Sequence, residues 1–406
     1  MTRKKNTRNP QGGGSIDQLK DGRWRGRYTA GRDPVTGKQV QKAVWGKTQK
    51  EALMKLQQIT TTINDGTYTE PSKITVGEWL DIWVNEYIRN RKYHTKRSYE
   101  GHIRNYLKPA LGQVRLQALT PAAIQAFFNR LQSDTCLSAK TIKNIHTCLH
   151  SALSTACEEE YLQSNPATNC RKRLPKVTKP PIKPFENDQL NAFLQAIENH
   201  RWESLYFVTL FTGLRQSEVL GLTWDNINFD NGTIFACKQL LRAKGVYQFD
   251  TLKNGKTKTI TPTPDVMDEL KKQRRRQTEW KLRADFDKPG SMWDNTGGVL
   301  SGSPWDDHTG LVFTNEIGGH LSHYTVYKDF KKIVDTLGIP EKRFHDTRHT
   351  YAVVSLQAGD DVKTLQENMG IHSAAFVLDT YGHVTEQMKR DSANRMHEFI
   401  NGIKKL

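Results

Sequence analysis

The chain has 406 residues, of which 60 are Lys or Arg and 43 are Asp or Glu, so its formal net charge is +17 at pH 7. This length predicts two or three domains, because single domains usually have about 100–200 residues, and the basic excess favours a polyanionic partner such as a nucleic acid. No run of about 18 apolar residues could span a membrane, and the N-terminus lacks an apolar signal core, so we expect a cytoplasmic protein. The five cysteines are odd in number and lack Cys-x-x-Cys spacing, which argues against a disulfide framework and a zinc module.

Residues 1–70 are predicted to form a small DNA-binding domain of three strands and one helix. In the second strand a period of two places arginines on one face and aromatic side chains on the other. An exposed basic face over an aromatic core gives the same pattern, so both interpretations stand. A capping box at Thr48 and Glu51 then predicts the helix. The candidate DNA ligands of this domain are Arg23, Arg25 and Arg27.

Residues 71–170 are predicted to form an all-helical DNA-binding domain. Thr75 opens its first helix with a capping box, and N-cap residues predict further helices at residues 95–107, 120–131 and 138–161. Basic side chains stand near the helix starts, where free backbone N–H groups also favour phosphate. As isolated charges they also fit a solvated surface. These candidate DNA ligands are Lys92, Lys96, Arg97, Lys140 and Lys143.

Residues 171–185 combine six basic residues with four prolines and contain no acidic residue. This composition predicts a linker stiffened by proline, which fits a protein that closes around DNA as well as a solvated hinge. Its first three residues, Arg171, Lys172 and Arg173, are further candidate DNA ligands.

Residues 186–406 are predicted to form the catalytic domain. Strand-like runs at residues 233–241, 246–252 and 258–261 lie between helices, and the chain ends in a helix with apolar residues at helical spacing. The Gly-rich and Ser-rich segment 287–310 predicts a loop to which we assign no role. The predicted fold is therefore multidomain α+β: a small three-stranded sheet plus helix, an all-helical domain, and a mixed, mainly helical domain with a small antiparallel sheet.

Three distant segments of this last domain together supply two arginines, a histidine and a tyrosine: Arg215, His345, Arg348 and Tyr381. Two guanidinium groups can hold the non-bridging oxygens of a phosphodiester as negative charge builds in the transition state. The tyrosine is then the candidate nucleophile, although a phenol with a pKa near ~10 needs a neighbouring base or cationic field. Glu218, three residues after Arg215, can orient that guanidinium; a surface ion pair has the same spacing.

His345 and His349 stand four residues apart on one predicted helix, a spacing that zinc sites use. No third ligand is fixed by spacing, and Asp346 stands where the metalloprotease pattern has glutamate. We therefore predict neither a metal nor a cofactor.

Four ordered motifs resemble the tyrosine recombinase family, the phage-type integrases, and most closely the integrases of conjugative transposons and prophages of Gram-positive bacteria. Residues 212–224 are similar to the family's first-arginine motif, residues 345–350 to its His-x-x-Arg motif, and residues 378–384 to its nucleophile segment. Residues 251–260 resemble the hairpin that carries the family's lysine, which places that role on Lys253. A chance match to all four motifs in order is far less expected than a chance match to one.

The resemblance implies a site-specific DNA recombinase that integrates and excises a mobile element. Tyr381 would attack the phosphate and form a 3′-phosphotyrosyl bond, and Lys253 would protonate the 5′ oxygen that leaves. His345 would assist proton transfer while the two arginines hold the phosphate. Exchange between two duplexes implies a homo-tetramer on double-stranded DNA, with arm sites bound by the first domain and core sites by the second. An accessory excision factor is a further implied partner.

One position departs from the family pattern. Ile371 stands where the family has a histidine or tryptophan, and isoleucine can neither donate a hydrogen bond nor carry a proton. Either His372 takes that place, or the enzyme works slowly, or this copy is impaired and acts as a DNA-binding regulator. A type IB topoisomerase, with the same chemistry but no strand exchange, is a further alternative.

Overall fold

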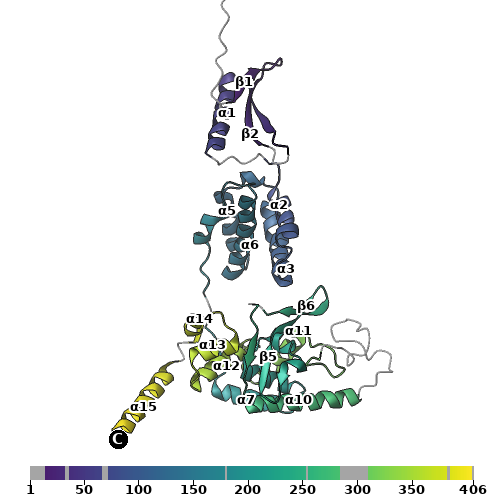
Figure 1. Cartoon of the computed structure of the whole chain (residues 1–406), viewed down its shortest axis with the longest axis vertical. Helices are drawn as coiled ribbons and strands as arrows, with labels where there is room; N and C mark the ends of the chain where they lie inside the picture. The colour runs from purple at the N-terminus through teal and green to yellow at the C-terminus, as the bar shows by residue number, and fades with distance from the viewer. Residues whose placement is uncertain are drawn as a thin grey trace, which may run out of the picture. The chain divides into compact units, whose positions relative to one another are not determined.

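The computed structural model describes residues 14–32, 36–65, 72–178, 181–252, 255–283, 310–381 and 385–404, and for residues 385–392 it describes the backbone alone. The chain divides into two compact units, Met1–Thr178 and Lys179–Leu406. Figure 1 shows a sheet with one helix and a helical domain in the first unit, and a mixed domain in the second. Among the described residues, no helix has the length and apolar content that a membrane crossing requires.

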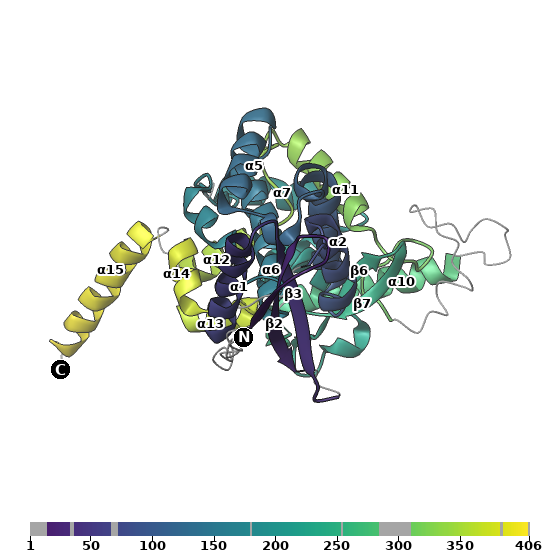
Figure 2. The same ribbon diagram turned by 90° about the horizontal axis from the view of Figure 1, so that it is seen from above.

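The N-terminal sheet is antiparallel in the order β1 (Ser15–Gln18), β2 (Trp24–Arg32) and β3 (Gln39–Gly46), and α1 (Gln49–Asn64) packs on it. Figure 2 shows α1 alongside β2 and β3. Gly26 allows β2 to lie close to the helix, because a Cβ there would sit 3.2 Å from the Cβ of Leu56. The period of two in β2 therefore places Gly26 and the buried Tyr28 toward the helix.

The start of α1 differs in one detail from the predicted capping box. Thr48 accepts a hydrogen bond from the backbone N–H of Glu51 at 3.2 Å, as predicted. The Glu51 carboxylate, however, accepts from the backbone N–H of Lys47 at 2.8 Å, one residue earlier than the box requires. The turn before the helix is tight, since a Cβ on Gly46 would lie 2.6 Å from the nitrogen of Ala52.

The helical domain has the elements α2 (Val76–Ile82), η1 (Trp83–Tyr87), α3 (Tyr93–His102), η2 (Ile103–Leu107), α4 (Lys108–Leu111), η3 (Leu116–Ala118), α5 (Pro121–Asp134), α6 (Ala139–Glu158) and η4 (Thr168–Arg173). Its first helix begins with the predicted capping box at Thr75. The indole N–H groups of two buried tryptophans hold α2 and η1 against α6: Trp79 donates to the carbonyl of Ala152 at 2.8 Å, and Trp83 donates to the Thr155 hydroxyl at 3.1 Å. Satisfying both donors allows these large rings to be buried.

The second unit has the helices α7 (Asn187–Ile197), α8 (Glu203–Thr212), α9 (Gln216–Leu220), η5 (Trp224–Asn226), α10 (Pro264–Arg283), α11 (His323–Thr336), α12 (Asp346–Gln357), α13 (Val362–Met369), α14 (Ala374–Tyr381) and α15 (Thr385–Ile403). Its strands are β4 (Ile227–Asn228), β5 (Thr233–Ala236), β6 (Lys238–Ala243), β7 (Val246–Thr251) and β8 (Lys258–Ile260). They form an antiparallel sheet in the order β4-β5-β8 and a separate β6-β7 hairpin. The predicted strand at residues 233–241 is thus two strands that belong to different sheets.

Two apolar clusters position the elements of this unit. The larger cluster surrounds α8, whose Tyr206 packs its ring against Phe193 and Phe330. The smaller cluster joins α12, α13 and α14 through residues such as Val353, Met369, Val377 and Tyr381. Figure 2 shows these three helices together at one side of the unit.

The predicted fold class is confirmed, since the described residues contain the three-stranded sheet with its helix, the helical domain and the mixed domain. The segment predicted as a linker contributes to both units: residues 171–173 belong to η4, whereas Phe185 is buried against Phe193. Of the predicted loop 287–310, residues 287–309 lie outside the described residues.

Candidate active site and nucleic-acid interface

A left-handed residue at the end of α8 places Arg215. Gly213 ends this helix at φ 61°, and a Cβ at this position would collide with the ring of Tyr351. Leu214 is then buried, and Arg215 becomes the N-cap residue of α9. The turn thus anchors the chain on both sides of the guanidinium.

Glu218 fixes the arginine in place, as the i+3 spacing predicts. One carboxylate oxygen accepts from Arg215 Nη1 at 2.6 Å, and the other accepts from its backbone N–H at 3.1 Å. Only 1% of the Glu218 side chain is exposed, against 25% of the Arg215 side chain. The guanidinium is therefore held from its buried side and remains partly open to a ligand.

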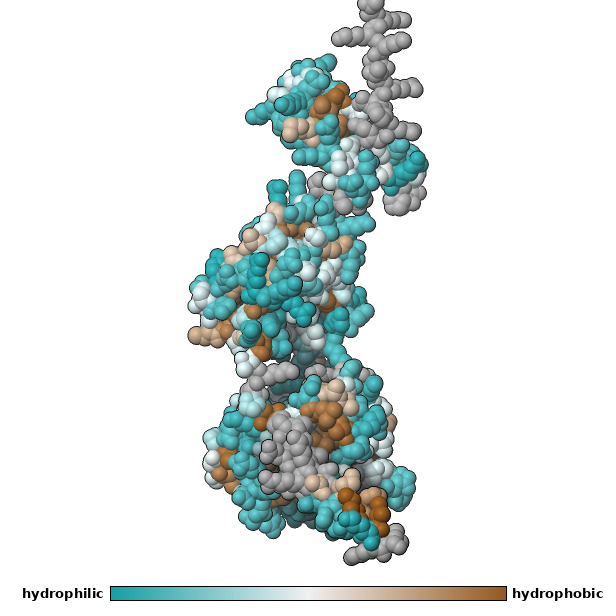
Figure 3. All heavy atoms as spheres, turned by 90° about the vertical axis from the view of Figure 1, so that its left-hand side faces the viewer, coloured by the Kyte–Doolittle hydropathy of each residue, from teal (hydrophilic) through white to brown (hydrophobic). Residues whose placement is uncertain are grey.

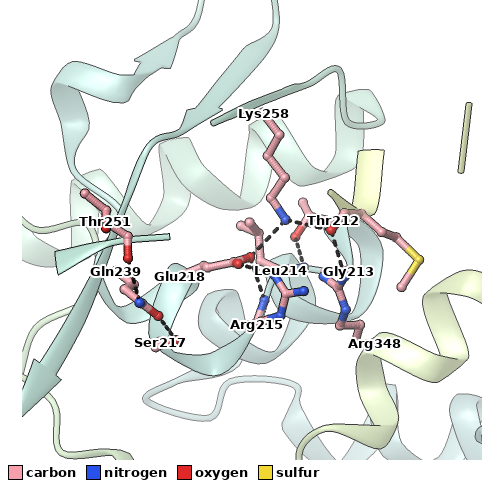
Figure 4. Close-up of polar contacts among 11 residues, drawn as sticks. Thr212, Gly213, Leu214, Arg215, Ser217, Glu218, Gln239, Thr251, Lys258 and Arg348 are labelled. Atoms are coloured by element: carbon pink, nitrogen blue, oxygen red, sulfur yellow. Dashed lines mark hydrogen bonds and ion pairs between the residues drawn. The ribbon is translucent and has the colours of Figure 1, made fainter. Parts of the chain in front are cut away.

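Lys258, which the sequence analysis did not select, lies beside the same carboxylate. Figure 4 shows its ammonium pointing from β8 toward Glu218, at 2.9 Å from Oε2. The ammonium also donates to the backbone carbonyl of Met369 at 3.4 Å. The side chain is 4% exposed, so a charged group that usually reaches water is enclosed here.

Arg348 occupies the opposite side of this network. Its Nη2 donates to the Met369 carbonyl at 2.7 Å, and its Nη1 donates to the carbonyl of Gly213. Figure 4 shows Arg348 and Lys258 approaching from different elements toward the turn that carries Arg215. Arg348 therefore contacts the turn before Arg215 through the Gly213 carbonyl. It is also linked to Glu218, the partner of Arg215, through the Met369 carbonyl and Lys258.

The charges in this network shift one another's pKa values. Burial lowers the pKa of Lys258 to about 8, with further lowering by Arg348 and Arg215 against the opposing effect of Glu218. Burial would raise the pKa of Glu218, but Lys258 and Arg215 outweigh it and hold that pKa at about 2. Burial and Arg215 lower the pKa of Arg348 to about 10. At pH 7 all three groups are therefore charged.

Tyr381 lies at the last residue of α14 and is 2% exposed. Its hydroxyl oxygen is 2.8 Å from Nδ1 of His349. Burial raises the pKa of Tyr381, whereas the charge of Arg348 acts to lower it. From the sequence, His349 was noted only for its four-residue spacing from His345, and no catalytic role was predicted for it.

His345 and His372 are both more accessible than Tyr381. His345 is exposed at the N-cap of α12, and its ring meets that of His349 edge to face at 5.1 Å between centroids. Although the residue as a whole is exposed, neighbouring atoms partly desolvate its ring, and this desolvation, with His349 and Arg348, lowers the pKa of His345. His372 is exposed, while Ile371 packs against the cluster that contains Tyr381. The expected lysine, Lys253, lies outside the described residues.

The two residues that sequence reasoning missed differ in how they could have been found. In β8, Lys258 and Ile260 alternate with the exposed Thr259, so the period of two marks Lys258 as a buried lysine. The contact of His349 with Tyr381 joins helices 32 residues apart, and no local pattern contains it. Among the described residues, no group of three or more His, Cys, Asp or Glu side chains could hold a metal ion.

The candidate DNA ligands of the first unit fall into distinct environments. Each predicted arginine of the sheet has a carboxylate partner: Arg23 pairs with Asp21 at 2.6 Å, and Asp17 pairs with Arg25 at 2.6 Å and with Arg27 at 3.5 Å. Lys96 is partly buried, and four others are exposed: Lys92, Arg97, Lys172 and Arg173. The remaining three line one hollow with neighbouring polar side chains: Lys140, Lys143 and Arg171 with Asn144, Thr147 and His150. Figure 3 shows that the visible face of the helical domain is largely hydrophilic.

Comparisons with known proteins agree with this geometry. Residues 183–388 match the Phage integrase family, and residues 75–132 match the phage integrase N-terminal SAM-like domain. The chain is 30% identical over 391 residues to the tyrosine recombinase XerC-like protein of Caldanaerobacter subterraneus, covering 92% of this chain and 95% of that protein. It is 24% identical over 410 residues to the ICEBs1 integrase of Bacillus subtilis, covering 95% and 100%.

Solved structures of integrases share the fold. The Tn1549 transposon integrase in complex with transposon right end DNA matches with a TM-score of 0.63 and 23% identity, over 80% of this chain and 100% of that chain. A lambda integrase tetramer bound to a Holliday junction matches with a TM-score of 0.53 and 18% identity, over 88% and 96%. From the matched catalytic domain and the relative that spans nearly its whole length, the chain belongs to the phage integrase family of tyrosine recombinases.

Proposed function

We propose that this recombinase cleaves and rejoins duplex DNA with Tyr381 as its nucleophile and Arg215 and Arg348 as its phosphate ligands. One observation carries the proposal: Arg348 donates to the carbonyl of Gly213, two residues before Arg215, although the two arginines are far apart in sequence. The charge of Arg348 also acts on the Tyr381 hydroxyl, so attacking group and phosphate ligand share one site. A dianionic transition state would meet both guanidinium groups there.

The chemistry needs neither a metal nor ATP. The Tyr381 oxygen attacks phosphorus, the bond from phosphorus to the 5′ oxygen breaks, and Lys253 protonates that oxygen as it leaves. Glu218 orients Arg215, and His345 contacts the phosphate from the accessible side of the site. The covalent bond conserves the phosphodiester energy, so a 5′ hydroxyl from a partner strand reverses the step.

His372 is the candidate phosphate ligand in the segment where the family has its second histidine. The backbone of Ile371 exchanges two hydrogen bonds with Gln366, at 3.0 and 3.1 Å, and its side chain faces the apolar cluster. This arrangement leaves the next side chain, His372, exposed. We assign to His372 a contact with the DNA phosphate backbone.

Strand exchange requires assembly, and α15 supplies a surface for it. Four apolar side chains at helical spacing are exposed there, at 42–65% of their surface: Met396, Phe399, Ile400 and Ile403. Brown atoms near the lower end of Figure 3 belong to this part of the chain. We propose that this face binds a second copy in a homo-tetramer on DNA. Sedimentation with DNA should show tetramers for wild type and smaller complexes for Phe399→Asp; an unchanged complex would exclude this surface.

The chemistry is tested with nicked duplexes that carry the junction sequence of the surrounding mobile element, in the absence of metal. Wild type should give a protein–DNA adduct on a denaturing gel, and Tyr381→Phe should give none. An adduct from both would assign the nucleophile elsewhere. If neither protein forms an adduct despite tight DNA binding, the Ile371→His variant is tested next. An adduct from this variant would identify an impaired recombinase. No adduct would identify a DNA-binding regulator.

A further inference from the structure

The hydroxyl of Tyr381 already has a partner. Its oxygen lies 2.8 Å from His349 Nδ1, which is the range over which a general base takes a proton, and the two ring centroids are 5.7 Å apart. His349 comes from α12 and Tyr381 from α14, so the contact is set by the packing of the apolar cluster that joins these helices. It is a contact between tertiary neighbours with little freedom to reorient.

The surroundings of both groups keep the pair uncharged before attack, with a histidine nitrogen free to accept the tyrosine proton. Burial raises the pKa of Tyr381, so the phenol does not ionise unaided at neutral pH. Burial lowers the pKa of His349 despite the opposing charge of Asp346, and Arg343 and Arg348 lower it further. The imidazole is thus neutral at pH 7, and one ring nitrogen carries a free lone pair. With the ring proton on Nε2, Nδ1 accepts the hydrogen bond that the Tyr381 hydroxyl donates.

The other histidines near the site are arranged differently. His345 lies one helical turn earlier and is exposed, and its ring meets His349 edge to face. His372 is exposed, and position 371 carries an isoleucine. Among the histidines that the structure describes, His349 is the one whose nitrogen contacts the Tyr381 hydroxyl oxygen.

We propose that His349 is the catalytic base of this recombinase. In the cleavage step the Tyr381 proton moves to His349 Nδ1 as the oxygen bonds to phosphorus, which leaves an imidazolium beside the phosphotyrosyl ester. In rejoining, the tyrosine oxygen leaves phosphorus and takes that proton back. The inference rests on the proposed function, because it requires Tyr381 to be the nucleophile.

His349→Asn is the informative variant. The side-chain oxygen of asparagine can occupy the place of Nδ1 and accept the tyrosine hydrogen bond, but it does not take up a proton. Single-turnover adduct formation should fall by about 10²–10⁴-fold, the usual contribution of a general base. Thermal unfolding and DNA binding are measured on the same samples. A loss of activity caused by misfolding would also lower the unfolding temperature or weaken DNA binding. A rate within threefold of wild type would overturn the proposal.

A substrate with sulfur at the 5′ bridging position separates the base from the acid. A thiolate leaves without being protonated, so this substrate should restore cleavage by Lys253→Ala but leave His349→Asn slow. Restoration of His349→Asn would place its defect at the leaving group and overturn the assignment.

The pH dependence of cleavage gives a second test. The cleavage rate of wild type should rise with pH as His349 loses its proton. The charged and titratable groups around His349 are Asp346, Arg343, Arg348 and His345. The His349→Asn variant should lack this rise. Absence of an adduct from wild type on both substrates would overturn the proposed function itself.

Discussion

Lys258 and Arg215 share the carboxylate of Glu218: Lys258 Nζ lies 2.9 Å from one oxygen, and Arg215 Nη1 lies 2.6 Å from the other. Because both oxygens are occupied, rotation of the carboxylate would break one of the two contacts. Lys258 therefore fixes the plane of the Glu218 carboxylate, which in turn holds Arg215 in place. It also donates to the carbonyl that Arg348 contacts, so one buried ammonium constrains both arginines that we propose as phosphate ligands.

Lys258→Met should damage both stability and cleavage. The change removes one partner of a buried ion pair, and such losses typically cost about 3–5 kcal/mol of the free energy of unfolding. Arg215 keeps its own bond to Glu218, so we expect the lower end, about 3 kcal/mol. Misplaced phosphate ligands should slow adduct formation on the order of 100-fold. Urea unfolding and single-turnover cleavage measure the two effects.

The matched control is Lys256→Met, which removes an exposed lysine two residues earlier. It should change the free energy of unfolding by less than about 0.5 kcal/mol, as for most surface substitutions. Equal losses of stability from the two variants would show that the buried pair has no special role.

The stability of the catalytic unit should depend on pH through Glu218. Its pKa is about 2 in the folded chain, below the ordinary value of 4.5, so the unfolded chain binds this proton more tightly. The stabilisation is complete above about pH 4.5 and is lost as the pH falls toward 2. The difference between the two pKa values corresponds to roughly 3 kcal/mol.

Unfolding of wild type and Glu218→Gln, measured between pH 6 and pH 3, tests this dependence. The variant is expected to be less stable at pH 6, because Lys258 loses its charged partner. The gap between the two proteins should narrow on acidification. Parallel curves would mean that Glu218 titrates normally in the folded protein.

Gly213→Ala should disturb the turn that carries Arg215. An alanine at φ 61° costs about 1–2 kcal/mol, and its Cβ would collide with the Tyr351 ring, which adds about 1–3 kcal/mol of overpacking. Gly232→Ala is the control, because its φ of 62° is nearly the same and no atom lies within 4 Å of the new Cβ. Thermal unfolding should show a larger loss at position 213, with slower cleavage at that position only. Equal losses would argue that the Tyr351 ring moves aside.

The basic hollow of the helical domain should bind DNA phosphates. Replacing its charged residues one at a time, as Lys140→Gln, Lys143→Gln and Arg171→Gln, should weaken binding to all duplex sequences alike. The slope of log affinity against log salt should become shallower by about 0.9 for each phosphate that the variant no longer neutralises. Arg130→Gln, on the exposed side of α5, serves as a control for net charge. A slope that changes equally in all four variants would indicate a diffuse charge effect instead of a binding site.

The sequence predicted features that repeat locally or follow from one helical turn. The Arg215 and Glu218 pair is such a case, because the i+3 spacing places both groups on the same side of a short helix. Burial along α1 shows the limit of such patterns: Leu53 is apolar yet 41% exposed, since a three-stranded sheet covers only part of the helix. A periodic pattern identifies the apolar face of a helix but does not show how much of that face the neighbouring sheet can cover.

Contacts between distant elements were beyond the sequence. A buried lysine such as Lys258 contradicts the usual exposure of lysine, and the Glu218 carboxylate 40 residues earlier, with the more distant Met369 carbonyl, offsets the cost of burying its charge. The hydrogen bond between His349 and Tyr381 depends on how α12 and α14 pack, which neither segment encodes alone. Lys258 and His349, whose roles the structure added, both make their key contacts with tertiary partners.

The burial of Tyr381 has a consequence for the fate of a broken DNA strand. If Tyr381 is the nucleophile that we propose, its ester would form at a side chain that is only 2% exposed and would be shielded from bulk water, so a strand hydroxyl held in the site would compete with little hydrolysis. Val377 and Met369 belong to the same apolar cluster as the Tyr381 ring. Shielding by this cluster would keep a temporary break from becoming a permanent nick.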